Sequence, residues 1–287
     1  MKLCPNVVVV LVIVPWVVIV THYFLEGAGV QCKLSETKNS HNDDPFLRLK
    51  LDANISSIFI NLGSNLDPIL PPLEYALTSL TIAVEPIVAS QITPHPLLIV
   101  VPAVVSTTSG LASMYSFNTN GVSSSLSLPS AESWWNTGRK GDGRVHVVAS
   151  ITLRQILQAL PKSVKRIPYL KTDLQGHDWT VINDTGSSLQ NFPVDFIFSE
   201  VYFERKSTYR DVNNDFCSDW MPNMVGLGYE LVYVDSPTKA GMSMRGAMRM
   251  CKRSQIAPNV GNKLDLKEGN ALWKRIGCLN EEFRFQR

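Results

Sequence analysis

Residues 167–178 constrain the fold most, because an apolar, strand-like run ends there in charged residues, a glycine and the start of a helix. Side chains alternate between the two faces of a strand, so Tyr169, Lys171 and Asp173 share one face. Burial of an unpaired charge is costly. We therefore expect Lys171 and Asp173 either to form a structural ion pair or to face a ligand crevice, which in open α/β sheets lies at the carboxyl ends of the strands.

Strand-like and helix-like segments alternate along the rest of the body. Strand patterns occur at residues 58–62, 80–84, 97–101, 112–117, 145–148, 194–200 and 229–234. Helical patterns or helix start signals occur at residues 67–80, 151–160, 177–189 and 220–227. This alternation predicts a three-layer α/β fold with a mostly parallel central sheet and right-handed crossovers.

The bulk composition bounds the architecture and argues against one class of partner. The chain has 287 residues, of which 45% are hydrophobic and 18% charged, which is enough for one large α/β domain behind a leader. A net charge of +2 is too small to favour nucleic acid, which normally needs a clustered basic face. From Lys239 onward, eleven lysine and arginine residues stand against four acidic ones, and we interpret residues 236–287 as a basic extension that is partly loop.

The leader predicts targeting to a membrane. Residues 7–20 form an apolar run that continues with lower hydrophobicity to residue 25. A spanning helix needs about 20 apolar residues and the core of a cleaved signal peptide about 7–15, so residues 1–25 are an apolar helix acting as a signal anchor or a signal peptide. Residues 26–52 then form a polar stem. We expect the domain at 53–287 to lie in the lumen of the Golgi or ER as part of a type II single-pass membrane protein, or to be secreted.

Cysteines and glycosylation sequences are compatible with such a compartment. Beyond the leader the cysteines are Cys32, Cys217, Cys251 and Cys278. They allow three disulfide pairings, and the alternative is that they are small buried hydrophobes. No C-x-x-C occurs, which disfavours a zinc ribbon or a thioredoxin-like site. Acceptor sequences for N-glycosylation begin at Asn54 and Asn183.

Two further strand ends carry residues suited to a nucleoside. Gly63 follows the first strand, and Glu85 ends the second. A glycine turn lets the backbone approach a ligand, and a carboxylate after the second strand can accept hydrogen bonds from ribose hydroxyls. A dinucleotide needs a cradle for its pyrophosphate, whereas this turn has a single glycine followed by Asp67, which would repel phosphate. S-adenosylmethionine carries a ribose and a cationic sulfonium but no phosphate, so the turn favours it over NAD or FAD.

Three segments in this order resemble a known family. Residues 59–65 read FINLGSN, residues 83–86 read AVEP, and residues 170–178 read LKTDLQGHD. They resemble the first motif, the ribose-binding strand end and the K-x-D-x-[EQ]-G element of the FkbM family of S-adenosylmethionine-dependent methyltransferases. Weaker likenesses lie at residues 103–106 and 123–126, and the resemblance covers roughly residues 58–203.

The resemblance implies a Rossmann-like methyltransferase fold and assigns roles to individual residues. The cofactor S-adenosyl-L-methionine would be bound by Asn61, Gly63, Ser64, Asn65 and Glu85. The chemistry and position of the residues themselves, rather than the resemblance, suggest the catalytic groups: Asp173 near the acceptor, Lys171, which would tune it, and His177 as a candidate base. No metal site is expected. The chain departs from the family pattern at Asn61, where an acidic residue is usual, and at Asp67, where a second glycine is usual.

The expected reaction is methyl transfer to an oxygen of a small-molecule or glycan-like acceptor. The glycan part rests on the lumenal address alone, and the sequence leaves the oligomeric state open. The alternative is a non-catalytic binding or scaffold protein of the same fold that has lost the cofactor, which the departures at Asn61 and Asp67 favour. A lumenal glycosyltransferase is disfavoured because no D-x-D motif is present, and a serine hydrolase because no G-x-S-x-G elbow is present.

Overall fold

The computed structural model describes residues 5–14, 17–26, 51–52, 54–116, 123–129, 144–192, 194–203, 209–236, 239–256 and 268–277. Its strands are β1 (Pro5–Val14), β2 (Val17–Glu26), β3 (Ser57–Leu62), β4 (Ser79–Val84), β5 (Leu98–Val101), β6 (Val104–Ser106), β7 (Gly110–Ser116), β8 (Arg144–Thr152), β9 (Arg166–Thr172), β10 (Val194–Tyr202), β11 (Tyr229–Ser236), β12 (Lys239–Met242) and β13 (Glu268–Arg275). Its α-helices are α2 (Leu153–Ala159), α3 (Asp178–Thr185), α4 (Ser187–Asn191), α5 (Met221–Met224) and α6 (Met244–Ile256). Shorter helical turns are η1 (Leu73–Tyr75), η2 (Ala89–Gln91) and the π-helical η3 (Phe216–Trp220).

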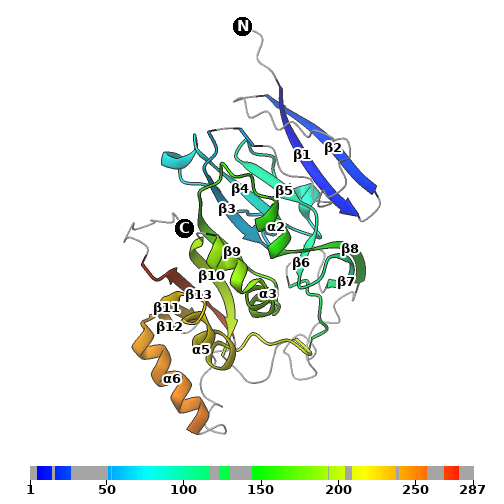
Figure 1. The fold of residues 1–287 in the computed structure, drawn as a ribbon. Helices are drawn as coiled ribbons and strands as arrows, with labels where there is room; N and C mark the ends of the chain where they lie inside the picture. The colour runs from blue at the N-terminus through cyan, green and yellow to red at the C-terminus, as the bar shows by residue number, and fades with distance from the viewer. Residues whose placement is uncertain are drawn as a thin grey trace, which may run out of the picture.

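The central sheet has eight strands in the order β12-β11-β13-β10-β9-β3-β4-β5 (Figure 1). The five strands from β10 to β5 run parallel to their neighbours. β13 is antiparallel to both β10 and β11, and β12 is antiparallel to β11. The prediction of an α/β fold with a mostly parallel central sheet, compatible with a Rossmann-like fold, is therefore confirmed.

The chain reverses its direction across the sheet between β3 and β9. From β3 it adds β4 and β5 on one side, and it later returns to β9 on the other side of β3 and adds β10. The carboxyl ends of β3 and β9 lie together, because Leu62 is paired with Thr172. In open α/β sheets, ligands bind outside the carboxyl ends at such a switch point. The residues that follow these two strands, Gly63 and Asp173, therefore lie where this architecture places a ligand.

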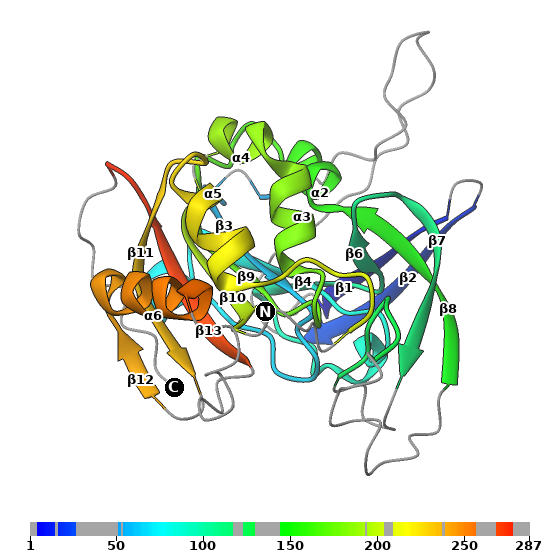
Figure 2. The same cartoon turned by 90° about the horizontal axis from the view of Figure 1, so that it is seen from below.

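The α-helices pack on one face of the sheet. Figure 2 shows α2, α3, α4 and α5 on the same side of the central strands. Ile60 of β3, Leu157 of α2 and Ile182 of α3 belong to one apolar core, which continues to Trp220 and Trp273. Within the described residues, every α-helix that buries apolar side chains does so in this core. The expected third layer, a set of helices on the opposite face, is therefore not seen in this part of the chain.

The helix predicted over residues 67–80 is wrong. Residues 66–72 form an irregular loop, and only η1 is helical in this segment. Pro71 and Pro72 explain the difference, because proline inside a helix removes a backbone hydrogen bond and clashes with the preceding turn. The residues that opened the expected helix, Asp67 and Pro68, therefore start a loop.

This loop covers part of the face that the helices leave open. Asn61 and Thr81 alternate with the core residues of β3 and β4, so they point to that opposite face. The amide of Ile69 donates to Asn61 Oδ1 over 3.0 Å, and Thr81 Oγ1 donates to the carbonyl of Ile69 over 2.7 Å. Two polar side chains of the sheet thus hold the loop in place of a helix.

Several boundaries differ from the sequence-based expectation. The strands expected at 112–117 and 145–148 correspond to β7 and β8, which form a separate three-stranded sheet with β6. The helix expected at 177–189 is divided at Gly186, whose φ is 38°, into α3 and α4. The segment 236–287, interpreted as partly loop, contains β12, α6 and β13. β13 completes the sheet between β10 and β11.

The leader differs from the apolar helix expected within residues 1–25. The structure has β1 and β2 there, paired antiparallel from Pro5 opposite Glu26 to Val14 opposite Val17. The run is rich in β-branched valine and isoleucine, which favour strands, and Pro15 would interrupt a helix. Among the described residues, no helix is both long enough and apolar enough to cross a membrane.

One disulfide joins two parts of the helical face. Cys217 in η3 is bonded to Cys251 in α6, across a sequence separation of 34 residues. Phe216, Ala247 and Cys251 are buried in the main core next to this link. Cys32 and Cys278 lie outside the described residues. The disulfide therefore ties α6 to the segment that precedes α5, and it is one of the pairings that the sequence allowed.

Replacing both bonded cysteines by alanine should lower the free energy of unfolding by about 2–4 kcal/mol, because the open chain gains conformational freedom. Urea denaturation followed by circular dichroism measures this. Each single replacement, Cys217→Ala or Cys251→Ala, should cost nearly as much as the double replacement, since either one removes the bond. Additive costs of the two single variants would contradict the disulfide.

Candidate functional site

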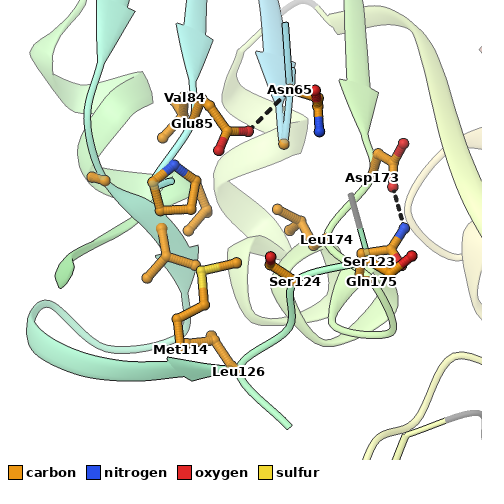
Figure 3. A pocket seen from close by; sticks show the side chains of 15 residues that line it. Asn65, Val84, Glu85, Met114, Ser123, Ser124, Leu126, Asp173, Leu174 and Gln175 are labelled. Atoms are coloured by element: carbon orange, nitrogen blue, oxygen red, sulfur yellow. Dashed lines mark hydrogen bonds between the residues drawn. The ribbon is translucent and has the colours of Figure 1, made fainter. Parts of the chain in front are cut away.

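A pocket opens at the carboxyl ends of the parallel strands, beside the switch point (Figure 3). Its volume is about 270 Å³, just below the roughly 300–1,000 Å³ of ordinary ligand pockets. The apolar part of its wall comes from Val84, Pro86, Ala103, Val104, Val105, Met114, Leu126 and Leu174. The remaining lining residues are Gly63, Asn65, Glu85, Ser123, Ser124, Asp173 and Gln175. An apolar wall with a few converging polar groups is typical of a small-molecule site.

Gly63 fixes the turn after β3 against the end of β9. Its φ is 68°, and a Cβ added to it would lie 2.0 Å from the carbonyl oxygen of Asp173. The amide of Gly63 donates to the carbonyl of Val84 over 2.9 Å, and the amide of Asp173 donates to that of Leu62 over 3.0 Å. Only glycine fits both the space and the left-handed backbone. The turn therefore holds the ends of three neighbouring strands together.

Glu85 is a buried carboxylate at the end of β4 that backbone amides hold in place. Its Oε2 accepts a hydrogen bond from the amide of Asn65 over 2.9 Å. Its Oε1 accepts from the amides of Ile87 and Val88 over 2.8 and 3.2 Å. A carboxylate offers about four lone-pair sites, so these bonds orient the group and leave acceptor capacity on Oε2. Because Glu85 also lines the pocket, a ligand hydroxyl can use that capacity.

Asp173 reaches the pocket from the end of β9. Its Oδ1 accepts a hydrogen bond from Gln175 Nε2 over 2.8 Å (Figure 3). Lys171 Nζ lies 4.0 Å from Asp173 Oδ2, with the side chains 23% and 38% exposed. An ion pair that is this long and this exposed contributes little to stability. Asp173 is therefore oriented mainly by Gln175.

Gln175 also connects Asp173 to a network of acidic and phenolic groups. Its Nε2 lies 3.5 Å from Glu200 Oε2, and its Oε1 accepts a hydrogen bond from the Tyr209 hydroxyl over 2.8 Å. The Tyr202 hydroxyl donates to the same Glu200 oxygen over 3.1 Å. A displacement of Gln175 would thus disturb both Asp173, which lines the pocket, and Glu200.

Burial and neighbouring charge raise the pKa of two carboxyl groups in this region, Asp178 and Glu200. Burial raises the pKa of Asp178 to about 7, and the charge of Asp173 adds to the effect. Burial also raises the pKa of Glu200 well above its ordinary value, with Asp173 and then Asp178 contributing. Asp178 Oδ1 accepts from the amide of Leu174 over 3.0 Å, whereas its buried Oδ2 has no hydrogen-bond partner among the described residues. A cationic ligand nearby would favour the ionised form of this cluster.

The segment at 123–129 lies across the turn that follows β9. Ser125 Oγ donates to the carbonyl of Gln175 over 2.9 Å, and Ser127 Oγ lies 3.0 Å from His177 Nε2. Burial lowers the pKa of His177 to about 4, so the imidazole is neutral near pH 7. These contacts fix the wall of the pocket that carries Ser123, Ser124 and Leu126.

The structure brings together four of the eight expected site residues and leaves four outside the pocket wall. Gly63, Asn65, Glu85 and Asp173 line the pocket. The others are Asn61, whose Oδ1 binds the loop amide of Ile69; Ser64, which is buried; Lys171, which flanks Asp173; and His177, which is bonded to Ser127. Asp67, expected to repel phosphate, is exposed and also lies outside this wall.

Sequence reasoning missed several members of the site. Gln175 lies inside the K-x-D-x-[EQ]-G segment, so the motif itself contained the signal for this residue. Its φ of 51° is a conformation that this residue type rarely adopts. Residues 103–105 and 123–126 carry only weak likenesses to the family in the sequence. Tyr202 and Tyr209 carry no local pattern that would place them behind the pocket, because the contacts with Glu200 and Gln175 are made by the fold.

Replacing Gly63 by alanine should lower the free energy of unfolding by at least about 2 kcal/mol, because the left-handed backbone and the contact with Asp173 both oppose a Cβ. Thermal or urea denaturation measures the change. The matched control is Gly246→Ala within α6, where the nearest atom to the added Cβ is 3.7 Å away. That variant should be as stable as the wild type or slightly more stable. Equal stability of the two variants would contradict the close approach.

The raised pKa of Asp178 predicts a specific pH dependence of stability. A carboxyl group that binds its proton more tightly when folded stabilises the fold at low pH and loses that contribution as the pH rises toward its folded pKa, here about 7. The lowered pKa of His177 acts in the opposite direction between about pH 4 and 6.5.

Comparing the wild type with Asp178→Asn cancels the contribution of His177, which is present in both proteins, and reports on Asp178 together with its effect on Glu200. The advantage of the variant in free energy of unfolding should grow between pH 4 and pH 7 by up to about 4 kcal/mol, at about 1.4 kcal/mol for each unit of pKa. Denaturation curves across this range measure it. A difference between the two proteins that does not change with pH would show that Asp178 is not buried as described.

Comparisons with known proteins do not assign the chain to a family. No protein-family model matches the chain, and no curated protein or solved structure matches it either. The chemistry assigned to the pocket therefore rests on its own residues and on their place in the sheet.

Proposed function

We propose that the chain binds S-adenosylmethionine in this pocket and transfers its methyl group to an oxygen of a small-molecule or glycan-like acceptor. The observation that carries the proposal is the meeting of Gly63, Glu85 and Asp173 in one pocket at the switch point of the sheet. These are the glycine turn and the ribose-binding carboxylate that the likeness to FkbM methyltransferases implies, and the carboxylate expected near the acceptor.

The pocket residues match the cofactor in polarity and in charge. The absence of a side chain at position 63 lets the turn approach Asp173, so that both residues line the pocket. Glu85 has acceptor capacity for ribose hydroxyls, and apolar residues such as Val104 and Leu126 supply wall area for an adenine ring. The carboxyl cluster of Asp173, Asp178 and Glu200 favours a positive charge such as a sulfonium.

A cofactor without phosphate is favoured over NAD or FAD by the loop that follows β3. Pyrophosphate is normally bound at the N-terminus of a helix that starts directly after the glycine turn. Here residues 66–72 form a loop, and the first helical residues are the three of η1. A pyrophosphate would therefore find neither a helix N-terminus nor a second glycine at this turn.

In the proposed reaction, S-adenosylmethionine would supply an electrophilic methyl group on its sulfonium and would be released as the neutral thioether S-adenosylhomocysteine. The residues of the chain orient the reactants and move a proton. Glu85, held by three amides, fixes the ribose end. Asp173, held by Gln175, would accept the proton that the acceptor hydroxyl loses on methylation. The glycan-like acceptor follows from the expected lumenal or extracellular compartment, which stays a prediction.

The second candidate is a non-catalytic binding protein that has lost the cofactor. One observation favours it: the carboxylate of Glu85 already accepts three backbone hydrogen bonds, so ribose hydroxyls would have to share it. Binding of S-adenosylmethionine discriminates between the two readings, because the second predicts none.

Titration calorimetry with S-adenosylmethionine tests the proposal on the full chain. The wild type should bind, and Glu85→Gln should bind at least tenfold more weakly, which corresponds to about 1.4 kcal/mol. The matched control is Glu74→Gln, an exposed glutamate outside the pocket wall, which should bind like the wild type. Circular dichroism verifies that each variant is folded. Absence of binding by the wild type at millimolar cofactor would exclude the methyltransferase reading.

A further inference from the structure

The two N-glycosylation sequences lie in different structural settings. Asn54 is exposed in a turn before β3, and Ser56 is the last residue before that strand. Asn183 lies within helix α3, with Thr185 as the last residue of the helix. Glycosylated asparagines lie in surface loops, where the bulky sugar and its linkage are accessible. The two sites therefore differ in setting, because Asn54 lies in a surface turn and Asn183 in a helix.

The side chain of Asn54 is already in a position that tolerates the linkage. Its Nδ2 donates to the carbonyl of Leu77 over 2.8 Å, and the residue is exposed. Attachment of a sugar replaces one of the two hydrogens on Nδ2. The remaining hydrogen can still donate to Leu77, so the glycosylated side chain keeps this bond.

The sequence at Asn183 lacks an accessible hydroxyl. Thr185 is 1% exposed, and its Oγ1 donates to the carbonyl of Val181 over 2.8 Å within the helix. The intervening Asp184 is engaged as well, because Arg154 donates to its carbonyl over 2.6 Å. Although Asn183 itself is exposed, its partner hydroxyl is buried and bonded.

Large apolar side chains are exposed next to Asn54. Leu77, whose carbonyl accepts the hydrogen bond from Asn54, is 83% exposed, and Leu73, four residues earlier, is 91% exposed. Single exposed apolar residues are common, but two large ones so fully exposed within one short segment favour association. A glycan on Asn54, which is hydrogen-bonded to this segment, would shield it.

We infer that Asn54 carries an N-linked glycan that covers Leu73 and Leu77, and that Asn183 remains unmodified. The donor is a lipid-linked oligosaccharide diphosphate. The bond from Nδ2 to the first sugar carbon forms, the bond from that carbon to the diphosphate oxygen breaks, and one Nδ2 proton is released. The disulfide between Cys217 and Cys251 independently favours an oxidising compartment, where this donor is found. The inference does not depend on the methyltransferase proposal.

Expression of the full chain in cells with a secretory pathway tests the assignment. Treatment with peptide N-glycosidase followed by peptide mass spectrometry should show conversion of Asn54 to aspartate and an unchanged Asn183. Asn54→Gln and Ser56→Ala should each abolish the gel shift that the enzyme produces, whereas the matched control Asn183→Gln should retain it in full. A wild-type chain without a glycan, or one glycosylated at Asn183, would overturn the inference.

A separate experiment tests whether the glycan on Asn54 covers Leu73 and Leu77. The unglycosylated Asn54→Gln variant should bind more of a hydrophobic fluorescent dye, and self-associate more in analytical ultracentrifugation, than the glycosylated wild type. Adding Leu73→Ser and Leu77→Ser to that variant should remove the increase, because both side chains are exposed and make no core contacts. Equal dye binding by the wild type and by Asn54→Gln would contradict the covering role.

Discussion

A Cβ at position 63 would lie 2.0 Å from the carbonyl oxygen of Asp173, so the turn after β3 and the end of β9 can meet only through a glycine. The rest of the pocket follows from this contact. The same turn presents the amide of Asn65 to Glu85, which fixes the carboxylate at the end of β4. Asp173 in turn receives a hydrogen bond from Gln175. The positions of both carboxylates thus depend on one close backbone approach.

Two further carboxyl groups lie close to Asp173. Asp178 and Glu200 are held close to Asp173 by the turn at 174–178 and by β10, and burial raises the pKa of both. Such a cluster is unfavourable as a set of three anions, and it becomes favourable when a cation approaches. Shifted pKa values of this kind are typical of functional sites, although structural networks also produce them. This is the electrostatic reason for proposing a sulfonium here rather than a phosphate.

The sequence was sufficient to predict the class of fold and the strand ends that form the pocket. Strand alternation and the K-x-D-x-[EQ]-G segment predicted that Gly63, Glu85 and Asp173 would come together, because carboxyl ends of parallel strands share one edge of a sheet. It was insufficient where tertiary contacts override local pattern. The pattern at 67–80 suggested a helix, but two prolines within it oppose a helix. Asn61 instead accepts a hydrogen bond from the loop that forms there.

Long-range pairing accounts for the remaining differences. β13 comes from a segment whose basic composition resembled a tail, yet it completes the sheet between β10 and β11. The polar segment at 123–129 shows no periodicity, and its place beside Gln175 depends on a hydrogen bond across 50 residues. The Val- and Ile-rich leader fits both an apolar helix and a strand pair by composition, so its pattern alone could not separate the two.

Hydrogen–deuterium exchange with and without S-adenosylmethionine tests the central claim most directly, because it reports where on the chain the cofactor binds. The account predicts slower exchange in four segments that converge on the pocket, at residues 63–66, 85–88, 123–127 and 173–176. Segments at the opposite edge of the sheet, such as β12, should exchange at an unchanged rate. Protection confined to other parts of the chain, or no protection under conditions in which the protein is folded, would contradict a cofactor site at this switch point.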